Sequence, residues 1–336
     1  MSTDLSPLNN VHRLLFAISL APLQGCRFQP TGFPGLGAAT FQTRDGACLL
    51  VESVQSMANR LELTIWDEAR QDLKPDLAGL SHVRVLRNGG FLTDTILESH
   101  RLNSPYLLEG SDKSFFDTLK SDFGLLETGP VNRARLAGVL LKYDIGSLLH
   151  GIFLAKKELA GGRLRLARSL SAFVEADQVR VAASGGVKND HVNPSGESKT
   201  GFGNVPFARD EFTAEHITLY VNLDLVQIRG YALGDDAERL LIILALYKLR
   251  ALVDGSLRLR TACDLKVIDR SVKATLPEGY ELPTLEEMTS SLKTAIMNCK
   301  GRMVPKTVNF NDELKKAKDQ AEGNLGSGTS GDYSGV

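Results

Sequence analysis

The sequence has few cysteines, and they are not spaced to act together. Its 336 residues include four, Cys26, Cys48, Cys263 and Cys299, and none of them forms a CxxC pair. Thiols at short spacing are typical of zinc sites and redox motifs. The scattered cysteines therefore predict no metal site, and they favour reduced thiols in a cytosolic protein.

Long apolar runs are also missing. The runs Leu14–Leu23 and Leu240–Leu246 fall well short of the ~20 residues that a membrane span needs. The first run ends in a stretch up to Cys26 that loosely resembles a lipoprotein cleavage box. Asp4 lies before the run and Pro22 interrupts it, so we interpret it as a core strand. We expect a cytoplasmic protein with no membrane partner.

Catalytic patterns are absent as well. The six histidines show no spacing typical of a nucleophile or a metal site, and the loop Gln24–Thr43 contains no Asp or Glu. Metal-dependent phosphodiester cleavage needs carboxylates or their equivalents to hold the ion. The nearest candidates are Asp190 and Asp210, each beside a cation. We therefore expect no catalytic residues and no cofactor, and the alternative is a metal-dependent nuclease.

The charge is small overall but unevenly placed. The formal net charge is −1 and the hydrophobic fraction is 43%, which indicates a globular protein that is not histone-like. Between Val131 and Leu170, however, there are eight Lys and Arg residues and only two acidic residues, Asp144 and Glu158, which gives a local charge of +6. This segment predicts an anion-binding surface.

One basic strand is predicted inside this segment, near its end. Its leucine side and its cationic side alternate at period two, which is the pattern of a half-buried strand. The apolar side is Leu164, Leu166, Leu170, Ala172 and Val174, and the other side is Arg163, Arg165, Ser169 and Ser171. A second short strand, Gln178–Ala183, is expected to follow.

The next two dozen residues read as a long arm without a core of its own. They are rich in Gly, Asn, Ser and Pro, which form turns, and they carry cations and the aromatics Phe202 and Phe207. Loops of this length inside a domain tend to be functional or disordered. A cationic arm with aromatics suits a groove that follows a phosphate backbone and stacks on bases. The alternative is an ordinary mobile loop.

The predicted order of elements indicates an α+β fold. The pattern gives β, α, insertion, β, β, long loop, β, α, β, which fits a ferredoxin-like sheet backed by two helices, as in RNA-recognition folds. The main elements are expected at Val11–Leu20, Ala47–Trp66, Val131–Tyr143, Ile217–Ile228, Asp235–Leu252 and Leu257–Ile268.

Several long strings closely resemble one protein family. They are RFQPTGFP (27–34), VESVQSMANRLE (51–62), SHRLNSPYLLEG (99–110), GGRLRLARSLSAFVEA (161–176), GGVKND (185–190), GFGNVPFARDE (201–211) and LRLRTACDL (257–265). They resemble the backbone subunit of type I-G (formerly I-U) CRISPR interference complexes, in the seventh Cas family of the RAMP superfamily. The resemblance covers roughly residues 11–270.

The resemblance implies the shape of a right hand. An RRM-like palm would comprise residues 11–68 and 130–270, with a thumb at 182–210 and inserted fingers at 69–129. We expect a peripheral helical segment at 271–322 and a disordered tail at 323–336. Copies of such a subunit stack along the CRISPR guide RNA, so the implied partners are the guide, further copies, other Cascade subunits and the target DNA strand.

The resemblance also implies where the guide RNA lies. The implied RNA-binding residues are Arg27, Gln29, Thr31 and Phe33 in the first loop, Gln55, Ser56, Asn59 and Arg60 on the first helix, and Arg163, Arg165, Arg168 and Ser169 on the basic strand. To these the composition of the arm adds Lys188, Asn189, His191, Lys199, Phe202, Phe207 and Arg209 as predicted RNA-binding residues. Type III relatives cut RNA with a loop aspartate, which makes an endoribonuclease of that kind the alternative function.

Overall fold

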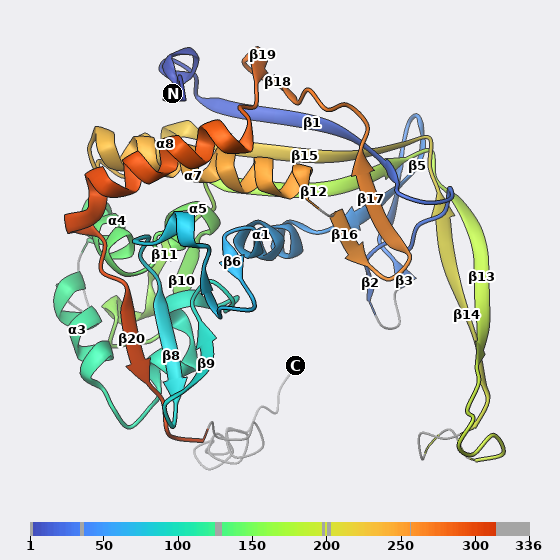
Figure 1. Cartoon of the computed structure of the whole chain (residues 1–336), viewed down its shortest axis with the longest axis horizontal. Helices are drawn as coiled ribbons and strands as arrows, with labels where there is room; N and C mark the ends of the chain where they lie inside the picture. Colours follow the sequence, from blue (N-terminus) through green and yellow to red (C-terminus); the bar gives the residue numbers. More distant parts are fainter. Residues whose placement is uncertain are drawn as a thin grey trace, which may run out of the picture.

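A curled antiparallel sheet of seven strands runs across the molecule (Figure 1). The computed structural model describes residues 3–33, 37–124, 130–196, 199, 203–255 and 257–313. The strand order is β16-β17-β1-β15-β12-β5-β4. These strands are β1 (Arg13–Pro22), β4 (Thr40–Thr43), β5 (Gly46–Glu52), β12 (Leu170–Asp177), β15 (His216–Asp224), β16 (Leu257–Arg260) and β17 (Cys263–Val267).

Alternation along the strands decides which face of this sheet is buried. In β1, Leu14, Phe16, Ile18 and Leu20 are buried, whereas the residues between them are partly or fully exposed. Successive side chains of a strand point to opposite faces, so one face carries the core. The buried first strand predicted at Val11–Leu20 is confirmed.

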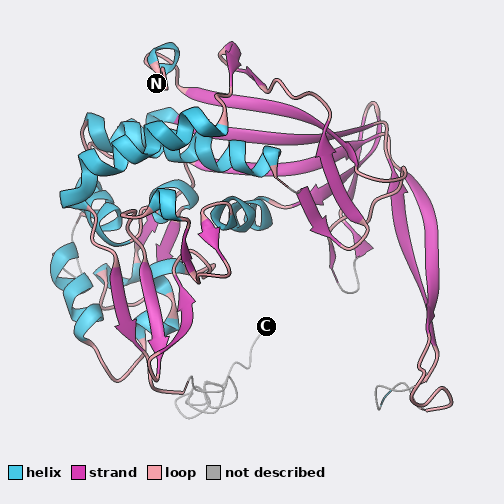
Figure 2. Ribbon diagram, in the orientation of Figure 1, coloured by secondary structure: helices cyan, strands magenta, loops and turns pink. Residues whose placement is uncertain are grey.

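Helices cover the buried face of the sheet. The helix α1 (Val54–Leu63) packs on β12 and on α7 (Asp235–Asp254), which in turn carries α8 (Leu285–Cys299). Acidic residues in the first turn of α7 suit the positive end of its dipole. A capping box between Thr284 and Glu287 begins α8. The predicted α+β class is confirmed by this arrangement of helices and sheet (Figure 2).

The predicted helix Ala47–Trp66 is wrong in its first third. Residues Gly46–Glu52 form the strand β5, in which Cys48, Leu49 and Val51 are buried, and α1 begins only after Ser53. The Ser53 hydroxyl accepts a hydrogen bond from the Ser56 amide (3.3 Å) and caps the helix. The apolar residues of β5 happen to match the helical spacing of those in α1, so the two elements were predicted as one helix.

The single basic strand is also corrected, because it is two strands in two sheets. β11 (Leu164–Leu166) pairs with β10 (Ile152–Leu154), whereas β12 joins the large sheet. Between them, the Ser169 amide donates to Leu149 O (2.9 Å), which turns the chain toward α5 (Gly146–His150). In the same way, the predicted strand Leu257–Ile268 is the hairpin β16–β17.

A second lobe is built around a small sheet with strands from distant parts of the chain. β8 (Val83–Arg87) pairs antiparallel with β9 (Gly90–Asp94) and parallel with β20 (Lys306–Asn309). The lobe also contains β6 (Trp66–Asp67), β7 (Asp72–Leu73), α2 (Pro105–Leu108), α3 (Ser114–Phe123) and α4 (Arg133–Tyr143).

The segment predicted to be helical after residue 271 contains strands as well as α8. These are β18 (Lys273–Thr275), β19 (Glu278–Glu281) and β20. β20 is a strand because it extends an existing sheet edge, which a local helix pattern does not reveal. The tail predicted at 323–336 lies outside the described residues.

The predicted arm loop is a long β-hairpin. β13 (Arg180–Lys188) pairs in continuous antiparallel register with β14 (Val205–Thr213), from Arg180 opposite Thr213 to Lys188 opposite Val205. We call this hairpin the arm, and residues 189–204 its tip. Figure 1 shows the arm extending from the large sheet on the side opposite the second lobe, so the molecule has the shape of an arch.

None of the described helices is both long enough and apolar enough to span a lipid bilayer.

Candidate nucleic-acid interface

A cavity lies between α1, which packs on the large sheet, and the second lobe. It has a volume of about 620 Å³, and we call it the junction cavity. Four residues that the sequence assigned to the RNA groove line it together, namely Gln55, Asn59, Arg165 and Arg168. Residues from the polar face of α1 and from the basic strand, which were predicted separately, therefore line one concave surface.

Hydrogen bonds order the polar side chains of the junction cavity. Arg168 Nη2 donates to Gln55 Oε1, and Gln55 Nε2 donates to Asn59 Oδ1 (3.3 Å). Burial and the nearby charge of Arg101 lower the pKa of Arg168 below its usual value. A partly desolvated guanidinium of this kind favours an anion, because an anion restores the interactions lost from water.

The other two arginines of the basic strand lie in different settings. The Arg165 guanidinium carbon lies 5.0 Å from the centre of the Phe153 ring, and the two residues are opposite each other in the β10–β11 pair. Arg163 is exposed, and its Nε donates to Ala160 O (2.9 Å). Ser169 is not on the surface, because its side chain is buried and its hydroxyl donates to Leu148 O (2.8 Å).

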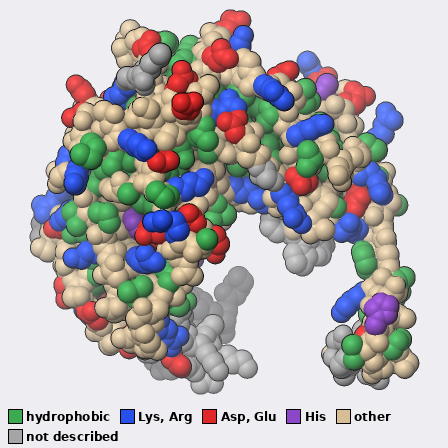
Figure 3. All heavy atoms as spheres, viewed as in Figure 1, with side chains coloured by type: hydrophobic (Ala, Val, Ile, Leu, Met, Phe, Trp, Pro, Cys, Tyr) green, Lys and Arg blue, Asp and Glu red, His purple; other side chains and the backbone are tan. Residues whose placement is uncertain are grey.

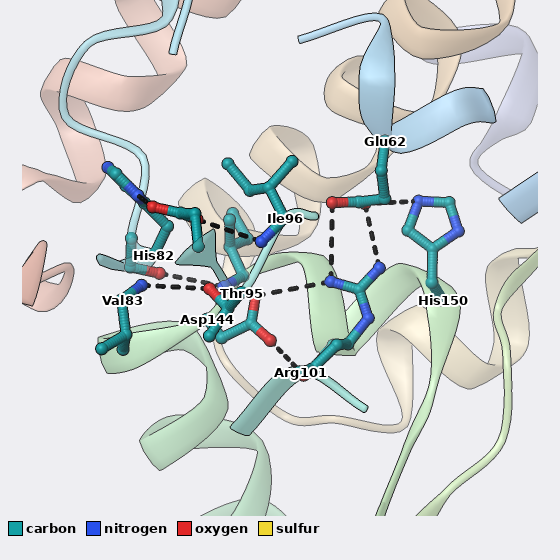
Figure 4. Close-up of polar contacts among 12 residues, drawn as sticks. Glu62, His82, Val83, Thr95, Ile96, Arg101, Asp144 and His150 are labelled. Carbon is teal, nitrogen blue, oxygen red and sulfur yellow. Dashed lines mark hydrogen bonds and ion pairs between the residues drawn. The ribbon is translucent and has the colours of Figure 1, made fainter. Parts of the chain in front are cut away.

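A buried ionic network lies beneath the junction cavity (Figure 4). Glu62 on α1 lies 3.2 Å from Arg101 Nη2 and 2.8 Å from His150 Nε2, and it also binds Lys248 on α7. Arg101 Nη1 lies 3.6 Å from Asp144 Oδ1. All five side chains are buried. The network therefore joins α1, α5 and α7 of the main body to the second lobe.

Gly146 leaves the room that this network needs. A Cβ atom at Gly146 would lie 2.5 Å from Arg101 Nη1 and 3.2 Å from Glu62 Oε1. Any side chain at this position would displace the guanidinium from its two carboxylates.

The ionisation of the network follows from burial and charge. Burial opposes the ionised form of Glu62, but the charges of Arg101 and Lys248 hold its pKa well below 4.5. Burial, together with the charge of Lys248, lowers the pKa of His150 to about 3, so this imidazole is neutral near neutral pH. Burial raises the pKa of Asp144 and lowers that of Lys248.

A second cavity, of about 760 Å³, lies at the base of the arm. We call it the arm-base cavity. Gln29 and Thr31 from the first loop line it, together with Arg209 and Asp210 from β14 and Arg260 from β16. The structure thus places the first loop beside the base of the arm, although no sequence pattern indicated that these two segments are neighbours.

Several predicted cations of this region already have anionic partners. Arg209 Nη2 lies 2.6 Å from Glu211 Oε1, and Arg27 Nη1 lies 3.6 Å from Glu211 Oε2. Arg60 lies 3.2 Å from Glu52 and donates to the Arg258 carbonyl (3.1 Å). These contacts hold the loop, the helix and the hairpin in place, and they leave Arg27 about half exposed.

The arm presents its predicted residues to solvent. Lys188, Asn189, His191 and Lys199 are exposed. Phe207 is 50% exposed, and its ring lies over the backbone of Gly186, its partner across the hairpin. Phe202 and the side chain of Phe33 lie outside the described residues.

Asp190 organises the start of the arm tip. Its carboxylate accepts hydrogen bonds from the amides of Val192 (2.9 Å), Asn193 (3.2 Å) and Gly203 (2.8 Å). These bonds lower the pKa of Asp190. Within the described ranges, no three His, Cys, Asp or Glu side chains gather closely enough to hold a metal ion.

Sequence reasoning missed Phe153, Asn103 and Arg260, which line the two cavities. Arg260 carried a usable signal, because it alternates with leucines in the string LRLR. Phe153 sits inside an apolar run that reads as core, and only its place in a short two-stranded sheet exposes it.

Comparisons with known proteins give the following likenesses. The family model described as CRISPR-associated protein GSU0053 matches residues 14–181, half of the chain. Among solved structures, a chain of a "CRISPR RNA-guided surveillance complex, pre-nicking" is similar with a TM-score of 0.36 and 14% sequence identity, over 76% of each chain. No curated protein matches the sequence.

Proposed function

Because the chain belongs to the family described as CRISPR-associated protein GSU0053, we propose that it is a guide-RNA-binding backbone subunit of a Cascade-type interference complex. The family match confirms the resemblance drawn from the sequence. The observation that carries the proposal is the junction cavity, where the polar face of α1 and the basic strand β11 converge. In this proposal, copies of the chain polymerise along the guide with other subunits, and the guide pairs with target DNA.

The order of strands supports an RRM-like palm. Along the chain, β1, α1, β12, β15, α7 and β17 follow one another, and their strands lie in the order β17-β1-β15-β12. A split βαβ arrangement gives this order, with antiparallel neighbours throughout. β5 is an addition, since it enters between β1 and α1 and pairs at the outer edge of β12. RNA-recognition folds of this kind bind single strands on an open surface.

The arch supplies a path for a single strand. Figure 3 shows an open space between the second lobe and the arm, with Lys and Arg side chains along its inner edge. One cavity lies beside the second lobe and the other at the base of the arm, and each is lined by arginines and uncharged hydrogen-bonding side chains together with one carboxylate, Glu98 or Asp210. Arginines that neutralise phosphates supply most sequence-independent affinity. A protein that must accept any guide sequence needs binding of this kind.

The length of RNA that copurifies with the protein tests this function. We expect RNA of uniform length after nuclease treatment, because a guide-loaded filament protects a fixed number of nucleotides. A smear of lengths would indicate a basic protein that binds RNA without assembling on it, and it would contradict the proposal.

Replacing Arg163, Arg165 and Arg168 together by Ala is expected to weaken binding of any single-stranded RNA. Each phosphate contact contributes roughly 0.7 to the slope of log affinity against log salt, so the slope should fall by about 2. The measurement is a titration at several salt concentrations.

A matched control removes the same charge elsewhere, through Lys293→Ala, Lys300→Ala and Lys306→Ala. These lysines are exposed and lie outside both cavities. If both triple variants bind alike while folded, the basic strand is not part of the RNA site.

We also propose that the subunit does not cut nucleic acid. The Asp190 carboxylate is occupied by three backbone amides, which leaves it poorly placed to hold a metal ion. Labelled RNA is therefore expected to remain intact with the protein and Mg²⁺ or Mn²⁺. Cleavage that disappears in Asp190→Ala or Asp210→Ala would favour the endoribonuclease alternative.

A further inference from the structure

The junction cavity has the features of a site for a single nucleotide. We propose that it receives one nucleotide of a bound RNA, with the base stacked on Phe153 and the polar atoms of the nucleotide held by donors on the facing wall. This inference rests on the proposed RNA-binding function and assigns a ligand position within it. The volume of the junction cavity, about 620 Å³, is in the range of pockets that hold small organic ligands.

Phe153 supplies a flat, exposed surface at this cavity. It lies on β10 between Ile152 and Leu154, which are both buried, yet its own side chain is 48% exposed. The Arg165 guanidinium lies 5.0 Å from the ring centre and supports the ring from the neighbouring strand. Bases stack on aromatic side chains without sequence preference, and arginines add cation–π attraction.

The other wall of the cavity presents hydrogen-bond donors. The Asn59 oxygen accepts from Gln55 (3.3 Å), and the Asn103 oxygen accepts from the Ala155 amide (2.9 Å). Each amide oxygen thus has a donor, and both side chains also carry an NH₂ group, which can only donate. Arg168 adds a guanidinium to this wall, and its Nη2 donates to Gln55 Oε1.

This pattern of donors selects the class of ligand. Phosphate oxygens, ribose oxygens and base carbonyls are acceptors, so a nucleotide matches the wall at several points. Glu98 also lines the cavity, but its Oε1 accepts a hydrogen bond from the Thr93 hydroxyl (2.9 Å). An acidic side chain would satisfy the donors but not the exposed ring, whereas a nucleotide uses both.

Phe153→Leu tests the site, because Leu keeps an apolar side chain but removes the flat ring. The full-length variant is titrated with a single-stranded RNA and with a matched RNA of the same length that carries abasic positions at regular intervals. We expect affinity for the intact RNA to fall at least about fivefold, the lower end of what one stacked base contributes. Affinity for the abasic RNA and the salt slope should change much less, because the phosphate contacts remain.

Phe41→Leu is the matched control. Phe41 is 40% exposed on β4 and lies outside both cavities, so its replacement should leave both affinities unchanged. Thermal unfolding of both variants checks that they remain folded.

Three outcomes would overturn the proposal. An unchanged affinity in Phe153→Leu shows that no base stacks there. An equal loss for intact and abasic RNA shows that Phe153 acts through packing or the RNA backbone. If the wild-type protein binds neither RNA, the proposed function itself fails, and that failure is distinct because it appears before any substitution is made.

Discussion

Removing the arm tip is expected to leave a folded monomer that no longer assembles on RNA. Residues 189–204 are replaced by Asn-Gly, so that two residues connect Lys188 to Val205. These two residues are opposite each other in the hairpin, so a two-residue turn closes it without a change of register. The variant keeps the two cavities but loses the exposed residues of the tip.

The expected loss follows from what the tip offers to a neighbouring copy. Asn189, His191 and Lys199 are exposed, and Val192 is 85% exposed at the end of a hairpin that reaches away from the body. The exposed cation of the tip, Lys199, can reach phosphates of RNA that a neighbouring copy holds.

Nuclease protection of bound RNA and sedimentation are the measurements for the shortened arm. The wild-type protein should protect RNA at regular spacing and sediment as a large assembly, whereas the variant should do neither. Regular protection by the variant would rule out the arm as the element that joins copies, even though the family assignment would stand. A lowered unfolding temperature with intact assembly would show that the tip only stabilises its own hairpin.

Glu62→Gln is expected to lower the free energy of unfolding by about 3–5 kcal/mol, because it leaves buried cations without their counter-ion. Glu62 is 2% exposed and contacts Arg101, Lys248 and His150. Urea unfolding at neutral pH measures the loss. The double variant Glu62→Gln with Lys248→Met should recover part of it, since one buried cation is removed together with the carboxylate.

The pH dependence gives a second check on Glu62. Its pKa is held well below 4.5, so its contribution to stability is present above that value and lost as the pH falls through the lowered pKa. The difference in the free energy of unfolding between the wild-type protein and Glu62→Gln should therefore become smaller in acid. Glu52→Gln is a matched control, because the partners of Glu52, Arg60 and Arg260, reach solvent and should give a smaller loss.

The sequence predicted those elements whose burial pattern is local and continuous. β1 and α7 appear close to their expected bounds, because alternation and helical spacing each persist for ten residues or more. The boundary between β5 and α1 was missed, since only the cap at Ser53 marks it. Only the start of the arm was predicted as a strand, at Gln178–Ala183. The rest was predicted as a loop because most residues of β13 and β14 are exposed, and so they lack an apolar alternation.

The candidate site was predictable in composition but not in arrangement. The polar face of α1 and the basic strand were named, and the structure brings Gln55 and Arg168 into contact. Ser169 was assigned to the surface because it alternates with Leu170, yet the chain turns at that point and buries it. Phe153 carries no pattern that separates it from core, and its exposure depends on a sheet of only two strands.

The position of β20 has a consequence for how the chain is made. β20 pairs with β8, which lies near the opposite end of the sequence. During synthesis the amino-terminal part folds first, so β8 emerges long before its partner strand exists. Until residues 306–309 leave the ribosome, that edge of β8 exposes unpaired amides and carbonyls, which attract other strands. The second lobe therefore closes this edge only after residues 306–309 have emerged, and a polypeptide that stops before Lys306 keeps it open to aggregation.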